Sequence, residues 1–169
     1  MPPRVPFTQT FLSGKELEYV TQVVEQGSLA SDGPFSQQSA EWLKQYCGAA
    51  GVLMTSSCTA ALEMAAMLCE LGPGDEVIMP SFTFVSTASA VTRTGAQPVF
   101  VDIDRRTLNI DPACIAEQVN SRTRAIIPVH YAGVGCAMEA IGELAREHGL
   151  VVIEDAAQGV GAAYGGRPL

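Results

Sequence analysis

Five short apolar segments recur along the chain, and each is followed by a stretch long enough for a helix or a ligand-binding loop. The segments are residues 52–55, 76–79, 98–101, 125–129 and 150–153. Strands with few polar residues that alternate with helices are typical of a parallel sheet covered by helices on both faces. The expected fold is therefore α/β, with three layers and a mostly parallel sheet.

Helical spacing of apolar residues predicts where the helices lie. In residues 137–148, Met138, Ile141 and Leu144 share one face, and Gly149 supplies a stop. Asp111 followed by Pro112 is typical of a helix start. Helices are expected at residues 14–26, from 34 onward, and at 57–71, 82–91, 112–119 and 137–148.

Composition and charge exclude several classes of protein. A chain of 169 residues with 47% hydrophobic content can bury a core without a disulfide or metal. Its net charge of -8 disfavours a nucleic-acid partner. No apolar run approaches the roughly 18 residues of a membrane-spanning helix, and residues 1–10 contain three prolines without the apolar stretch of a secretory signal. No membrane association is expected.

The cysteines give no sign of a metal site or a disulfide framework. Their number is odd and none forms a Cys-x-x-Cys pair, so small buried thiols in a reducing cytoplasm are expected. They are Cys47, Cys58, Cys69, Cys114 and Cys136.

Ligands of parallel sheets bind beyond the carboxyl ends of the strands, so those segments hold the candidate site residues. Residues 56–60 precede a helix whose free N–H groups could hold an anion, although Ser57 could equally be an ordinary N-cap. Asp155 follows the last strand and could pair with a protonated heterocyclic nitrogen or cap a helix. Phe84 could stack on a planar ring or lie in the core, and His130 could meet substrate or be structural.

Familiar nucleotide and hydrolase motifs are incomplete. The segments that begin at Gly133 and Gly159 lack the third glycine of Gly-x-Gly-x-x-Gly, and neither a Walker loop nor a Gly-x-Ser-x-Gly elbow occurs. An unrelated Rossmann-like nucleotide binder is thus a weaker alternative.

Four segments in this order resemble the DegT/StrS family of sugar-nucleotide aminotransferases over essentially the whole chain. They are SSCTAALEMA (56–65), GDEVIMPSFTFVST (74–87), IPVHYAG (127–133) and EDAAQG (154–159). The resemblance implies the large domain of fold-type I pyridoxal-phosphate (PLP) enzymes. Residues 1–50 would form an N-terminal helical segment and residues 51–169 part of the PLP-binding domain, with the C-terminal small domain absent.

The resemblance also implies roles for individual residues. Asp155 would keep the pyridine nitrogen of PLP protonated, Phe84 would stack on the ring, and Gln158 would lie beside the ring hydroxyl. His130 and Tyr131 resemble residues on the substrate side. The phosphate would be held by Cys58, Thr59 and Ala60.

The sequence departs from the family pattern at the catalytic lysine. That residue forms a Schiff base with PLP and lies in a Ser-Phe-His-x-Thr-Lys-Asn type segment, which would follow Leu169. The lysines present, Lys15 and Lys44, match helix surfaces instead. This chain is expected to be inactive by itself. The family pattern also places two further strands between 52–55 and 150–153, which would leave residues 52–55 at an unpaired edge.

The activity implied by the resemblance is transamination of a 4-keto-6-deoxy sugar nucleotide, dTDP-linked, with glutamate as amino donor. Such a reaction would serve cell-surface polysaccharide synthesis, of lipopolysaccharide or enterobacterial common antigen, in a cytoplasmic homodimer. The alternative is a truncated, non-catalytic homologue that binds a sugar nucleotide or a full-length subunit.

Overall fold

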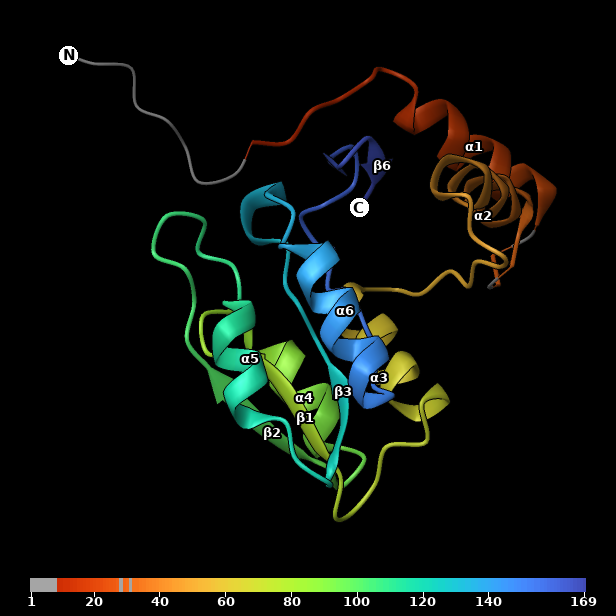
Figure 1. Cartoon of the computed structure of the whole chain (residues 1–169). Helices are drawn as coiled ribbons and strands as arrows, with labels where there is room; N and C mark the ends of the chain where they lie inside the picture. The colour runs from red at the N-terminus through yellow and green to blue at the C-terminus, as the bar shows by residue number, and fades with distance from the viewer. Residues whose placement is uncertain (1–8, 28, 31) are drawn as a thin grey trace.

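Four parallel strands form the central sheet of the protein. The computed structural model describes residues 9–27, 29, 30 and 32–169. The strands lie in the order β2-β1-β3-β4 (Figure 1). They are β1 (Glu76–Pro80), β2 (Gln97–Val101), β3 (Thr123–Ile126) and β4 (Val151–Val152). Every neighbouring pair is parallel, which confirms the predicted α/β class.

Helices cover both faces of this sheet. The three-layer prediction is confirmed, because α3 and α4 pack on one face while α5 and α6 pack on the other (Figure 1). Their bounds are α3 (Cys58–Leu68), α4 (Val85–Thr92), α5 (Pro112–Gln118) and α6 (Met138–His148). The predicted helix start at Asp111 is also confirmed, since its carboxylate accepts a hydrogen bond from the N–H of Ala113 at 2.9 Å.

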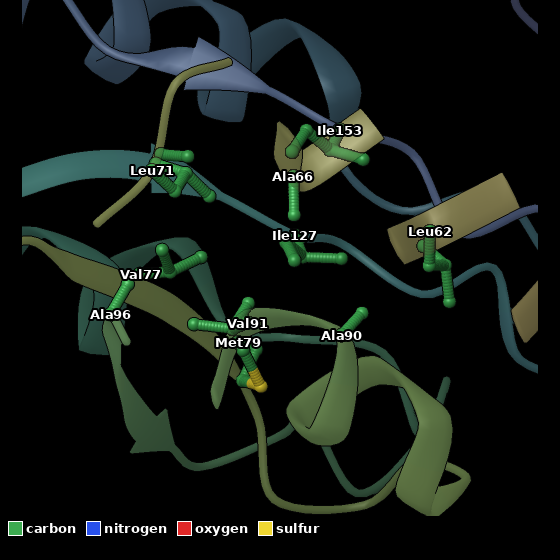
Figure 2. Close-up of a cluster of buried hydrophobic side chains, with 11 residues drawn as sticks. Leu62, Ala66, Leu71, Val77, Met79, Ala90, Val91, Ala96, Ile127 and Ile153 are labelled. Atoms are coloured by element: carbon green, nitrogen blue, oxygen red, sulfur yellow. The ribbon is translucent and has the colours of Figure 1, made fainter. Parts of the chain in front are cut away.

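Alternating side chains of β1 supply both halves of the core. Val77 and Met79 point into the cluster beneath α3 and α4, which Figure 2 shows, whereas Ile78 joins the cluster beneath α5 and α6. All three are fully buried. This arrangement follows from the two-residue period of a strand whose two faces are both covered.

Residues 52–55 form no strand, so that prediction was wrong. Leu53 is 70% exposed and Met54 is 46% exposed, and none of the four strands of the described sheet pairs with this segment. An extended segment becomes a strand only when a neighbouring backbone satisfies its N–H and C=O groups. Within the part of the chain that the structure describes, no strand supplies such a neighbour to residues 52–55.

A short hairpin near the C-terminus was not predicted. Strands β5 (Ala163–Tyr164) and β6 (Arg167–Pro168) are antiparallel and are joined by Gly165 and Gly166. Both glycines have positive φ, +55° and +79° respectively, which a two-residue hairpin turn of this kind requires. The Gly-Gly pair was the available sequence signal.

The first two helices form a separate layer. Helices α1 (Glu16–Gln26) and α2 (Pro34–Cys47) lie together, apart from the central sheet (Figure 1). The rings of Tyr19 on α1 and Phe35 on α2 lie against each other, with 5.1 Å between their centroids. Neither helix contributes a buried residue to the core. Across the part of the chain that the structure describes, no helix combines the length and apolar character needed to cross a bilayer.

Candidate functional site

Three segments meet at the carboxyl edge of the sheet. Asp155 follows β4, the first turn of α4 follows β1, and the start of α3 lies beside both. The backbone of Asp155 is held by the chain beyond β3: its N–H donates to the carbonyl of Pro128 at 2.9 Å, and its carbonyl accepts from the N–H of His130 at 3.1 Å. Residues distant in sequence therefore form one site.

The carboxylate of Asp155 is the centre of this site, and it is 5% exposed. Its Oδ2 accepts a hydrogen bond from the Thr87 hydroxyl at 2.9 Å. Its Oδ1 accepts from the Cys58 thiol at 3.6 Å and from the N–H of Ala157 at 3.2 Å. All of these donors are neutral, and no cationic side chain in the described ranges forms an ion pair with it. A buried carboxylate in such surroundings favours a bound group that carries a positive N–H.

The start of α3 can accommodate an anion. Ser57 is the N-cap, and its hydroxyl accepts from the N–H of Ala60 at 3.2 Å, so the N-cap interpretation of Ser57 is confirmed. Cys58 and Thr59 are the first two residues of the helix, where backbone N–H groups have no acceptor within the helix. Anions are stabilised at such a helix end. Of the three phosphate candidates, Cys58 and Thr59 thus offer free N–H groups, while the N–H of Ala60 is used by the cap.

Phe84 is the N-cap residue of α4 and is 73% exposed. The alternative that it belongs to the core is therefore wrong. Its ring is available to cover one face of a planar ligand. Nearby on the same loop, Phe82 contacts the ring of Tyr131 instead, with 4.7 Å between the ring centroids.

His130 has a structural role in this fold. It is 1% exposed, and its Nδ1 accepts a hydrogen bond from the N–H of Cys136 at 3.1 Å. Its proton therefore lies on Nε2, which donates to the Glu154 carboxylate at 2.8 Å. Both ring nitrogens are used within the protein. The structural alternative weighed for His130 describes this geometry better than direct contact with substrate.

The loop that follows His130 contains Tyr131 and contacts Gln158. The N–H of Tyr131 donates to the side-chain oxygen of Asn109 at 3.0 Å. Gln158 accepts from the N–H of Ala132 at 2.7 Å through its Oε1, and within the described residues its exposed amide NH₂ group makes no hydrogen bond. Sequence reasoning missed Asn109, and no motif pointed to it.

Sequence reasoning also missed three hydroxyl groups at the start of α4. Thr83 and Thr87 are joined by a hydrogen bond of 2.8 Å, and Ser86 bonds to Thr59 at 2.6 Å. The Ser86–Thr59 bond connects α4 to the phosphate candidates on α3, and the bond from Thr87 to Asp155 connects α4 to the carboxylate. The hydroxyl-rich run Ser81-Phe-Thr-Phe-Val-Ser-Thr87 was the available signal.

The pKa values of two thiols, those of Cys58 and Cys136, lie above the ordinary value for cysteine. Burial raises the pKa of Cys58 above its usual value, and the charge of Asp155 and the hydrogen bond to it raise it further. Burial and the charge of Glu154 raise the pKa of Cys136 to about 12. A protonated Cys58 is the form that can donate to the Asp155 carboxylate.

These pKa directions predict a selective pattern of cysteine alkylation. At pH 9, with a pKa of about 12, only about 0.1% of Cys136 is the reactive thiolate, and its side chain is fully buried. Iodoacetamide at pH 9 should therefore modify exposed Cys47 completely and leave Cys136 unmodified in native protein, as measured by peptide mass spectrometry. Unfolding in urea should abolish the difference. Equal modification of both residues in native protein would contradict the burial of Cys136.

The structure brings neither lysine to this site. Lys15 is the N-cap of α1 and Lys44 lies on α2, and both are exposed. The two helices that carry them lie apart from the sheet (Figure 1). No lysine of this sequence is thus positioned beside Asp155.

Comparison with known proteins agrees with this geometry. The model of the DegT/DnrJ/EryC1/StrS aminotransferase family matches residues 11–169. The chain is 44% identical over 165 residues to the spore coat polysaccharide biosynthesis protein SpsC of Bacillus subtilis, a match that covers 98% of this chain and 42% of SpsC. It is 42% identical over 165 residues to the GDP-perosamine synthase of Caulobacter vibrioides, which covers 98% of this chain and 44% of that protein.

A solved structure shows the same fold. NtdA from Bacillus subtilis with bound cofactor PMP superposes with a TM-score of 0.83 and 39% sequence identity, over 87% of this chain and 34% of that one. The chain spans less than half the length of the curated relatives it matches. These matches favour the aminotransferase interpretation over an unrelated Rossmann-like nucleotide binder.

Proposed function

Because this chain belongs to the DegT/DnrJ/EryC1/StrS aminotransferase family, we propose that the protein containing it transfers an amino group to a keto sugar nucleotide. The family is PLP-dependent, and NtdA, one of the similar solved structures, holds PMP as its bound cofactor. The observation that carries the proposal is Asp155, a buried carboxylate with only neutral donors. Bound PLP supplies an electron sink for the electrons of the carbon that gains or loses the amine.

The chain's own residues fit this cofactor. The negative charge of Asp155 can stabilise a protonated ring nitrogen. The exposed ring of Phe84 can cover one face of the cofactor. The first N–H groups of α3, at Cys58 and Thr59, can hold its phosphate. The free amide of Gln158 can donate to the ring oxygen. Residues 51–169 are accordingly proposed as part of the PLP-binding domain, and residues 1–50 as a helical segment.

A finer assignment concerns the substrates. We propose a 4-keto-6-deoxy sugar linked to dTDP, with glutamate as donor, in polysaccharide synthesis by a cytoplasmic homodimer. The names of two relatives, a spore coat polysaccharide biosynthesis protein and a GDP-perosamine synthase, support a sugar substrate. Since the second of these names a GDP-linked product, the experiment compares dTDP-linked and GDP-linked sugars directly.

The experiment uses protein produced from the whole coding sequence. Incubation with PLP, glutamate and a dTDP-linked 4-keto-6-deoxy sugar should give one 2-oxoglutarate for each amino sugar, measured by a coupled dehydrogenase assay and mass spectrometry. The matched GDP-linked sugar serves as the comparison for nucleotide preference. Absence of bound PLP and of 2-oxoglutarate with both sugars would contradict the proposal.

A second candidate function is binding without catalysis. It is favoured by the position of Lys15 and Lys44 on α1 and α2, away from Asp155. The 169-residue chain, incubated with PLP and treated with borohydride, should then bind cofactor reversibly and show no lysine adduct and no turnover. A stable adduct on either lysine together with turnover would contradict this candidate.

A further inference from the structure

The Asp155 carboxylate accepts a hydrogen bond from the second of two linked hydroxyl groups, those of Thr83 and Thr87. Thr87 is fully buried and its hydroxyl lies 2.9 Å from Asp155 Oδ2. The Thr83 hydroxyl lies 2.8 Å from that of Thr87. Both threonines come from the loop and first turn that follow β1, the same turn that exposes Phe84.

The donor and acceptor of each of these two hydrogen bonds follow from the carboxylate at which they end. An ionised carboxylate only accepts hydrogen bonds, so the single proton of the Thr87 hydroxyl is directed to Asp155. Thr87 must then accept at its oxygen, and Thr83 is the donor. Hydrogen bonds aligned in this way polarise one another, and bonds to a charged acceptor are stronger than bonds between neutral groups.

The two carboxylate oxygens are held differently. Oδ1 accepts from the Cys58 thiol at 3.6 Å and from a backbone N–H at 3.2 Å, whereas the Thr87 hydroxyl at 2.9 Å is the side-chain donor to Oδ2. Thiols are weak donors. Thr87 is thus the principal side-chain group that fixes the rotation of the Asp155 carboxylate within the described contacts.

We propose that Thr87, oriented by Thr83, is a positioning residue that holds the Asp155 carboxylate toward a protonated ring nitrogen. This inference rests on the proposed function and adds to it the group that sets the direction of the charge. Thr87 itself does not contact the cofactor in this assignment. Its effect is transmitted through Asp155. Residues that do not touch a metal ion orient metal-binding side chains in the same way.

The test compares the binding of two cofactors to protein produced from the whole coding sequence. One is PLP, and the other is its 1-deaza analogue, in which carbon replaces the ring nitrogen. Thr87→Val removes the hydroxyl and keeps the shape of the side chain. We expect this variant to bind PLP about tenfold more weakly, the factor that corresponds to about 1.4 kcal/mol, and to bind the analogue as the wild type does.

Three further variants keep the test decisive. Thr87→Ser retains the hydroxyl and should restore PLP binding. Thr83→Val, at a half-buried position that threatens folding less, should weaken PLP binding about threefold in the same direction. Thr92→Val on the exposed side of the same helix is the matched control and should change neither affinity. Melting temperatures of all variants show whether the fold is retained.

The outcomes separate this inference from the proposed function. Equal loss of both cofactors in Thr87→Val would show a general structural role and overturn the inference, as would unchanged PLP binding in both valine variants at positions 83 and 87. A wild-type protein that binds neither cofactor overturns the proposed function, and the inference with it. A wild type that binds both, with selective loss of PLP in Thr87→Val, supports both.

Discussion

Replacing Asp155 by asparagine should lower kcat/KM for amino transfer by about 10²–10³-fold, the largest effect on activity expected for any residue of this chain. The reason is electrostatic. Asn keeps the size of the side chain and can still accept from Thr87, but it removes the charge that faces the proposed ring nitrogen. A buried ion that loses its partner is destabilised by about 3–5 kcal/mol, and at about 1.4 kcal/mol for each factor of ten the lower part of that range corresponds to 10²–10³-fold.

The measurement is steady-state kinetics on protein produced from the whole coding sequence, together with the absorption spectrum of bound PLP. Asp111→Asn is the matched control, because it makes the same chemical change at the N-cap of α5, where asparagine caps as well as aspartate. That variant should retain wild-type rates. A loss of less than about threefold in Asp155→Asn would contradict the role proposed for this carboxylate.

Replacing Met79 by alanine should lower the free energy of unfolding by about 2–5 kcal/mol. Met79 lies on β1, is fully buried, and points into the cluster shared by α3, α4 and the sheet (Figure 2). Truncation leaves a cavity that close-packed neighbours fill only in part. Because a domain has only about 5–15 kcal/mol of stability, a loss of this size is a large fraction of the total.

Met67→Ala is the matched control for this prediction. Met67 lies on α3 and directly follows Ala66, which belongs to the same cluster, but its side chain is exposed (71%). Urea unfolding of the 169-residue chain, followed by circular dichroism, should show a shift for Met79→Ala and a change within about 0.5 kcal/mol for Met67→Ala. Comparable shifts in the two variants would contradict the burial pattern of β1.

Much of the fold followed from local patterns in the sequence. The apolar segments at 76–79 and 98–101, the Asp111-Pro112 start and the amphipathic helix near 137–148 all match elements of the structure. Each rests on interactions within one strand or one helix, which periodicity and capping residues report directly. The prediction of a strand at residues 52–55 was wrong because it depended on a distant partner. An apolar run becomes a strand only when a partner strand is present.

The candidate site was predictable to a smaller degree. Position at a strand end was enough to select Asp155, and the resemblance selected Phe84 and the start of α3. Neither the strand-end position nor the resemblance indicated that Thr87 would donate to Asp155. Neither indicated that both ring nitrogens of His130 would form hydrogen bonds, to Cys136 and Glu154. A hydroxyl or an imidazole has several possible partners, and only packing selects among them.

The sequence by itself determined the α/β class, the family, and the presence of a carboxylate at the ligand-binding edge of the sheet. These properties are encoded in residue periodicity and in motifs of a few residues each. Only the tertiary structure decided which side chains surround that carboxylate, because the side-chain donors come from positions 97 and 68 residues away in the chain. Such contacts form when parallel strands bring their carboxyl ends to one edge, and no local pattern specifies them.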